Sequence, residues 1–171
     1  MRLAVKMLGF ALATAASGMI MLLGGPSYAA SGEEVIKARI SFMQDDVYGE
    51  FKVLGAYAKS GKGSLADVEK SAMALAKLAE KISEHFPKDT GRGKYPDKTT
   101  RALPKIWTDW ERFKTEAQRL ADKSGKLAAL AKEGNKDAVV DLIGPSGRYG
   151  KTKIGCVECH DTFRGAKAKK K

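Results

Sequence analysis

The chain has 171 residues, the size of one compact domain. Hydrophobic residues make up 43% of it and charged residues 30%, which is typical of a globular protein and excludes a disordered one. Two cysteines are too few for a disulfide-rich scaffold. Its 31 lysines and arginines outnumber 20 acidic residues, but no helix-turn-helix, stacking-aromatic or glycine-loop signature accompanies this charge. We therefore expect no nucleic acid partner. The positive charge either serves to dock an acidic partner protein or has no specific role.

Residues 1–29 have the order of a secretory signal peptide. Arg2 and Lys6 precede an uncharged stretch of 19 residues (7–25), and small residues at Ser27 and Ala29 suit a signal peptidase. An uncleaved membrane anchor is the alternative, since this stretch almost spans a bilayer. Its many Ala, Gly and Ser residues favour cleavage. We predict an exported, periplasmic protein of residues 30–171, with no stable membrane insertion once the signal is removed.

Two amphipathic helices are predicted in the first half of this segment. From Glu33, apolar residues recur at steps of three and four, which indicates one helix with a buried stripe, and the sequence 60–63 (SGKG) ends it. Ser64 begins the second helix, with Asp67 as its capping-box partner, and the apolar pattern fades near His85. The irregular stretch 87–104 is long for a small domain, so we expect it to drape over another part of the fold.

Helical patterns continue to the C-terminus. A third helix follows Pro104 and closes at Gly134, with Gly125 as a candidate interruption. A fourth segment runs from Asp137 to Ile143, breaks at 144–150, and resumes before Cys156 to about residue 166. No strand pattern is present in the sequence. The prediction is an all-α fold, an antiparallel four-helix bundle.

The sequence Cys156-Val157-Glu158-Cys159-His160 concentrates the chemistry of the chain. C-x-x-C-H is the attachment sequence of haem c. Two thiols one helical turn apart can form thioethers with the two vinyl groups of one haem, and the adjacent imidazole is then held beneath the iron as its axial ligand. The sequence therefore predicts one covalent haem c near the C-terminus, held by Cys156 and Cys159, with His160 as the proximal iron ligand.

Three other interpretations of the cysteines compete with haem. A thiol redox pair would need a thioredoxin-like α/β context, which the helical patterns do not offer. A structural zinc site needs four ligands, and only His85 is left to help. A disulfide across two intervening residues would be strained and would stabilise little.

The chain resembles the cytochrome c′ family of class II c-type cytochromes over nearly all of residues 30–171. The C-terminal CVECHDTFR is similar to the family's C-x-x-C-H-x-x-[FY]-R ending, and residues 35–43 (VIKARISFM) to its I-K-x-R-x-x-x-M opening. The four-helix bundle is the known fold of this family. The resemblance implies that Arg39 lies near a haem propionate and that Arg164 packs near the proximal side.

The resemblance also implies a role for Met43, four residues after Arg39. In the family, Met at this position makes the iron six-coordinate and low-spin, whereas another apolar residue leaves it five-coordinate and open to small gases. Met on the apolar stripe is also ordinary core filler. Ligation of the iron by Met43 is the prediction, since thioether ligation opposite His suits electron transfer.

Two departures from the family pattern stand out. One residue more than usual separates Met43 from Val53-Leu54-Gly55-Ala56, which predicts a shifted register or a local bulge. The stretch Gly144 to Gly150 resembles an insertion, which we expect to border the haem edge. His85, at a helix end, is expected at the surface, and a haem with two histidine ligands through His85 is the weaker alternative.

We predict a periplasmic monohaem electron carrier and no enzyme, because no acid–base pair or nucleophile is evident. A five-coordinate protein that binds nitric oxide or carbon monoxide is the first alternative, and a haem subunit of a larger oxidoreductase is the second. Redox partner proteins are expected to dock through an acidic face. A homodimer through the first helix is an option that the sequence leaves open.

Overall fold

The computed structural model describes residues 31–145, 147 and 151–169. The predicted signal peptide, residues 1–29, lies outside the described residues, as does most of the 146–150 stretch. Among the described residues, secondary structure is helical apart from two isolated β-bridges, Arg92–Tyr95 and Ala102–Arg164. No described helix is long and apolar enough to cross a membrane. The all-α prediction is confirmed.

The first long helix has three consecutive parts: α1 (Gly32–Ser41), a π-helical stretch η1 (Phe42–Val47) and α2 (Tyr48–Ser60). Ser31 and Glu34 form a capping box at its start. Gly61 ends it with φ +67°, in the left-handed region that glycine enters without steric cost. The local bulge expected after Met43 is therefore present as a π-helix.

The second helix, α3 (Leu65–Glu80), begins as predicted. The Ser64 hydroxyl accepts from Asp67 N–H, and the Asp67 carboxylate accepts from Ser64 N–H. A short 3₁₀ helix, η2 (Ile82–His85), extends α3 towards the 87–104 loop. The helical segment therefore ends at His85, near which the apolar pattern fades in the sequence.

The third helix is one turn, α4 (Lys105–Thr108), followed by the 23-residue α5 (Trp110–Lys132). Asp109 separates them with a non-helical backbone (φ −129°, ψ 48°). Gly125 is not an interruption: α5 runs through it, and its Cβ position faces open space.

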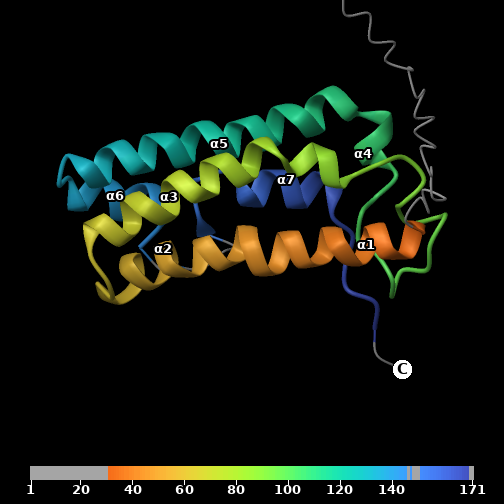
Figure 1. Cartoon of the computed structure of the whole chain (residues 1–171), viewed down its shortest axis with the longest axis horizontal. Helices are drawn as coiled ribbons and strands as arrows, with labels where there is room; N and C mark the ends of the chain where they lie inside the picture. Colours follow the sequence, from red (N-terminus) through yellow and green to blue (C-terminus); the bar gives the residue numbers. More distant parts are fainter. Residues whose placement is uncertain (1–30, 146, 148–150, 170–171) are drawn as a thin grey trace, which may run out of the picture.

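The fourth helix of the bundle is divided into α6 (Lys136–Ile143) and α7 (Cys156–Phe163). The predicted start before Cys156 and end near residue 166 are wrong by a few residues. Gly155 has φ +107°, which a right-handed helix excludes, and Arg164 is extended because it pairs with Ala102. Figure 1 shows α6 at one end of the bundle and α7 nearer to its middle.

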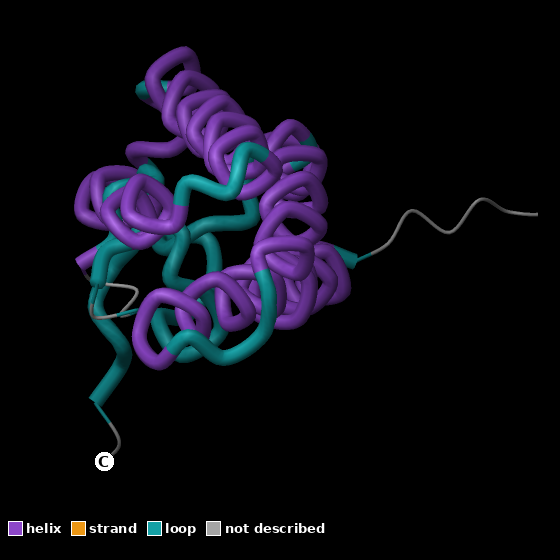
Figure 2. Tube along the Cα trace, turned by 90° about the vertical axis from the view of Figure 1, so that its left-hand side faces the viewer, coloured by secondary structure: helices purple, strands orange, loops and turns teal. Residues whose placement is uncertain are grey.

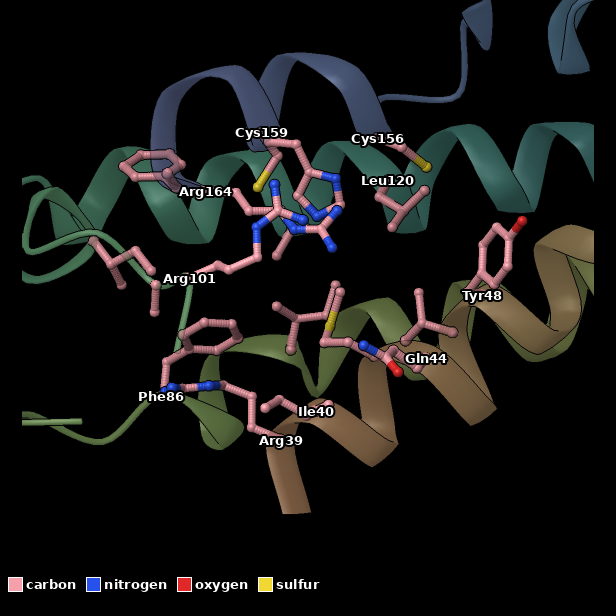
Figure 3. Close-up of a pocket in the computed structure, with 18 of the residues that line it drawn as sticks. Arg39, Ile40, Gln44, Tyr48, Phe86, Arg101, Leu120, Cys156, Cys159 and Arg164 are labelled. Atoms are coloured by element: carbon pink, nitrogen blue, oxygen red, sulfur yellow. The ribbon is translucent and has the colours of Figure 1, made fainter. Parts of the chain in front are cut away.

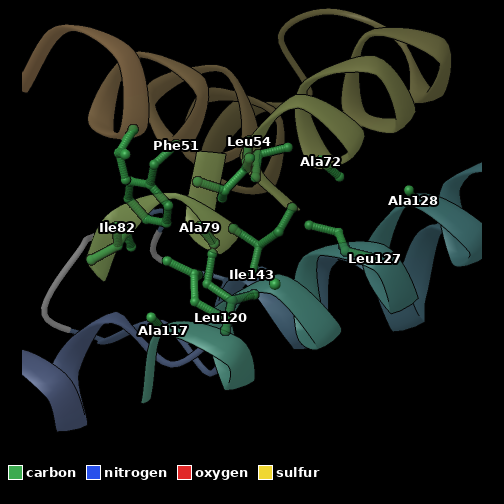
Figure 4. Packing of buried hydrophobic residues seen from close by; sticks show 14 of the residues in the cluster. Phe51, Leu54, Ala72, Ala79, Ile82, Ala117, Leu120, Leu127, Ala128 and Ile143 are labelled. Atoms are coloured by element: carbon green, nitrogen blue, oxygen red, sulfur yellow. The ribbon is translucent and has the colours of Figure 1, made fainter. Parts of the chain in front are cut away.

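The apolar core runs along the bundle and draws on most of its helices. Leu54, Leu75, Leu127 and Ile143 have no exposed surface, and Figure 4 shows side chains from α2, α3, α5 and α6 converging. Figure 2 views the bundle from one end, with the helices around its periphery. The core also reaches α7, because Phe113 and Phe163 are buried and their ring centroids lie 5.3 Å apart.

Candidate functional site

A cavity of about 890 Å³ separates α7 from the first helix. Its size is within the range of small-molecule and cofactor sites. In Figure 3, α7 and α5 lie on one side, and Arg39, Ile40, Gln44 and Tyr48 approach from the other. The residues that sequence reasoning selected all line it: Arg39, Met43, Cys156, Cys159, His160 and Arg164. Elements more than 110 residues apart in the sequence thus form one site.

Packing of α7 onto α5 places the cysteine motif. A Cβ at Gly155 would lie 3.7 Å from Leu120 N and 3.9 Å from Arg119 Cγ, so the start of α7 rests directly on α5. Lys123 Nζ of α5 also donates to Lys153 O at 2.6 Å and holds the segment that leads into α7. These contacts fix the turn on which Cys156, Cys159 and His160 stand.

The two thiols are half-buried, and burial raises the pKa of both Cys156 and Cys159 to about 12. For Cys159, the acidic side chains of Glu116 and Glu158 raise the pKa further. Such thiols stay protonated at neutral pH, whereas a thiol redox pair depends on a low pKa. Within the described part of the chain, no three His, Cys, Asp or Glu residues are placed to hold a metal ion. The protonated thiols argue against a thiol redox pair, and two cysteines followed by a histidine are the donor set of a covalently attached haem.

His160 is held as a neutral imidazole. Burial lowers its pKa to about 4, and the positive charges of Arg164 and Arg101 lower it further. A neutral imidazole is the form that ligates iron. The surroundings of His160 therefore suit an axial ligand at neutral pH.

The segment before α4 positions two arginines beside α7. Leu103 N–H donates to Phe163 O at 3.0 Å and Gly165 N–H donates to Arg101 O at 2.8 Å, around the Ala102–Arg164 bridge. Arg101 Nε also donates to Gly165 O at 2.7 Å. Burial lowers the pKa of Arg101 and of Arg164, and the charge of Arg164 lowers that of Arg101 further. Sequence reasoning missed Arg101, since only this pairing brings it to the cavity.

Arg39 is buried, with 3% of its surface exposed. Its guanidinium donates to Thr90 Oγ1 (2.8 Å), Thr90 O (2.8 Å) and Thr100 Oγ1 (2.9 Å), and lies 4.7 Å from the centre of the Phe86 ring. Burial lowers its pKa to about 10. The 87–104 loop therefore drapes over α1, as expected, and Arg39 fastens it there.

The π-helix keeps one face of the first helix on the cavity. Two rows at four-residue spacing line the cavity from this helix: Arg39, Met43, Val47 and Phe51, and Ile40, Gln44, Tyr48 and Lys52. In an α-helix a four-residue step overshoots a full turn by about 40°, so each row would rotate away by about 120° over three steps. The wider π turn, closed by Tyr48 N–H donating to Met43 O, counteracts this drift.

His85 does not contribute to the lining of this cavity. It is half-buried rather than at the surface, because its ring stacks on Phe42 with centroids 3.8 Å apart. Glu116 of α5 was also missed by sequence reasoning. It lines the cavity at 5% exposure and pairs with Arg119 at 2.7 Å. Its signal in the sequence is an acidic residue three positions after Phe113, within an apolar stripe.

Comparisons with known proteins agree with this site. Residues 34–164 match the family model described as Cytochrome C'. The cytochrome c' of Rhodopseudomonas palustris is 29% identical over 89% of this chain and 94% of its own length. A cytochrome c' structure from Rhodobacter sphaeroides has a TM-score of 0.63 at 28% identity, covering 80% of this chain and 98% of the other. A nitric oxide complex of a cytochrome c prime variant from Alcaligenes xylosoxidans has a TM-score of 0.61 at 25% identity, covering 81% and 99%.

The family match spans residues 34–164 and so includes the cavity-lining part of the first helix and the whole cysteine motif. The four-helix bundle and the covalent haem c predicted from the sequence are features of this family. The chain belongs to the cytochrome c′ family, whose members are haem proteins with one covalent haem c.

Proposed function

We propose that this protein is a periplasmic electron carrier whose haem is attached through Cys156 and Cys159 and whose iron is held by His160 and Met43. The observation that carries this proposal is the placement of Met43 and His160 on one cavity, on elements that face each other across it. Haem supplies one-electron exchange between Fe³⁺ and Fe²⁺. If His160 and Met43 both held the iron, the ligands from the protein would stay the same in the two oxidation states.

Each residue of the site would then have a separate role in holding the haem. The two thioethers fix the cofactor to α7, and burial keeps His160 neutral and available to the metal. The cation Arg39 would offer charge-assisted hydrogen bonds to a propionate, and Arg164 would pack near the proximal side of the haem. The η1 turn holds Met43 towards the cavity.

Exposed lysines surround the mouth of the cavity, and they support docking of an acidic redox partner. Lys52, Lys98 and Lys167 are all exposed and all line the cavity. Opposite charge on a partner would steer the encounter and make its rate fall with ionic strength. Export is inferred from residues 1–29 alone, and cleavage after Ala29 would leave residues 30–171.

Capture of a small gas is the second candidate function, because a similar fold has been solved as a nitric oxide complex. It requires that Met43 leave the iron or never bind it. The two candidates share the attachment site and differ in the sixth ligand.

Mass spectrometry of the protein exported by a host that matures c-type cytochromes tests the attachment. The proposal predicts a chain that begins at Ala30 and carries the added mass of one haem. The Cys156→Ala, Cys159→Ala double variant, secreted by the same host, should have the bare mass of the chain. Haem retained by this double variant, or wild-type protein without haem, would contradict the proposed attachment.

A further inference from the structure

Acidic side chains are scarce around the haem cavity. Among the described residues that line it, the acidic ones are Asp45 and Glu116, and only Glu116 is buried. Asp45 is exposed and accepts a hydrogen bond from Ser41 Oγ at 2.6 Å. The cationic lining is larger and includes three arginines that are buried or half-buried, Arg39, Arg101 and Arg164. Glu116 is thus the buried negative charge of a positive pocket.

The fold gives no packing reason for a charge at this position. Along α5, the neighbours of Glu116 on the same face are Phe113, Ala117 and Leu120, all buried. A buried carboxylate costs free energy unless it is paired. Arg119 Nη1 supplies the pairing at 2.7 Å, but its side chain is 44% exposed, whereas that of Glu116 is 6% exposed. Solvent therefore screens the cation of this pair more than the anion.

We propose that Glu116 is an electrostatic residue of the haem site: its buried carboxylate lowers the reduction potential of the haem, and Arg119 offsets part of this effect. The proposal rests on the proposed haem attachment. Ferric haem has one positive charge more than ferrous haem, so a nearby buried anion stabilises the oxidised form. Water weakens the field of a surface charge, but it does so much less for a charge that lines the cofactor cavity.

The same helix contains a matched control. Glu111 and Lys114 form an ion pair of the same spacing at 2.9 Å, with Glu111 84% and Lys114 44% exposed. This pair has the same charges and spacing as Glu116–Arg119, but its acid is in water and is not part of the cavity lining. Comparing the two pairs separates a specific effect of Glu116 from the general effect of changing the net charge by one.

The experiment is a spectroelectrochemical titration of the holoprotein at pH 7. At a fixed ambient potential, Glu116→Gln should raise the ratio of ferrous to ferric haem at least about threefold. Arg119→Gln should lower this ratio, because it leaves Glu116 without its partner. Glu111→Gln should change the ratio by less than about half as much as Glu116→Gln does, and Lys114→Gln by less than about half as much as Arg119→Gln does. Glu116→Asp, which keeps the charge, should restore most of the wild-type ratio.

Opposite signs for the two halves of the Glu116–Arg119 pair, each larger than the change in the matching Glu111 or Lys114 variant, are decisive, because neither a purely structural pair nor a change in net charge produces them. An unchanged ratio in Glu116→Gln would overturn the proposal. A shift in Glu111→Gln as large as that in Glu116→Gln would overturn it too. If the Glu116→Gln variant fails to mature, the Arg119→Gln variant still tests the proposal. A ferrous-to-ferric ratio in Arg119→Gln that is no lower than the ratio in Lys114→Gln would overturn the proposal. Covalent haem is measured first in each variant by mass, so a failed attachment in the wild-type protein contradicts the proposed function and not the role of Glu116.

Discussion

The guanidinium of Arg39 donates a hydrogen bond to Thr90 Oγ1 at 2.8 Å and thereby joins α1 to a loop 51 residues away in the sequence. The same side chain also lines the haem cavity. One residue thus closes the loop over α1 and contributes a positive charge to the cofactor site. Its hydrogen bonds to Thr90 and Thr100 hold the 87–104 segment, which contains no helix, against α1.

Arg39→Leu should destabilise the protein by about 1–3 kcal/mol, because Thr90 and Thr100 stay buried and lose charged donors. Arg39→Lys should recover only part of this loss, since one ammonium replaces a planar group that spans both threonines. Urea unfolding of the holoprotein measures both changes. An Arg39→Leu variant as stable as the wild type would show that these contacts contribute nothing.

Gly155→Ala should impair the site. Gly155 has φ +107°, where a Cβ is strained, and it precedes the first haem-binding cysteine. We expect a loss of about 1–2 kcal/mol in stability and a lower yield of covalent haem. Calorimetry and the haem-to-protein absorbance ratio check the two effects.

Gly125→Ala is the control for Gly155→Ala and should raise the stability of the protein instead of lowering it. Gly125 lies inside α5 and is exposed, and a Cβ there would meet no atom within 4 Å. Alanine is favoured over glycine in a helix by about 0.5–1 kcal/mol, so the melting temperature should rise. A fall in the melting temperature at residue 125 would mean that this face of α5 packs against something in solution.

Asp67→Asn should lower the stability in a pH-dependent manner. Hydrogen bonds from Ser64 hold the pKa of Asp67 below its ordinary value of 3.8. Because the folded-state pKa is lowered, the stabilisation is fully present above pH 3.8 and is lost as the pH falls through the folded-state pKa. The stability difference between wild type and variant should therefore be largest near neutral pH and shrink below pH 3.8. A difference that stays constant down to the acid limit would contradict this assignment of the cap.

Local patterns were enough to predict much of this structure. The capping pair Ser64–Asp67 and the apolar repeats located the helices. The one residue more than the family pattern after Met43 predicted a shifted register or a bulge, and a bulge is present as η1. These features depend on neighbours in the chain, which a sequence displays directly. The cysteine motif likewise concentrates its chemistry within five residues.

The remaining features depend on contacts between distant segments. Arg101 reaches the site only through the pairing of Ala102 with Arg164, and Arg39 is buried only because Thr90 and Thr100 fold over it. By sequence alone, arginine at a helical or loop position is expected in solvent. Glu116 could have been noticed as a charge within the stripe of α5, but its link to the haem site required the position of α7.

Absorption spectra of the purified holoprotein, oxidised and reduced, with and without carbon monoxide, test the central claim most directly. If Met43 and His160 both ligate the iron, the oxidised protein shows a low-spin spectrum with the weak far-red band of an iron–methionine bond, and carbon monoxide leaves the reduced spectrum unchanged. Met43→Ala should abolish the band and make the reduced protein respond to carbon monoxide. A high-spin wild-type spectrum that shifts with carbon monoxide would contradict ligation by Met43 and favour gas binding.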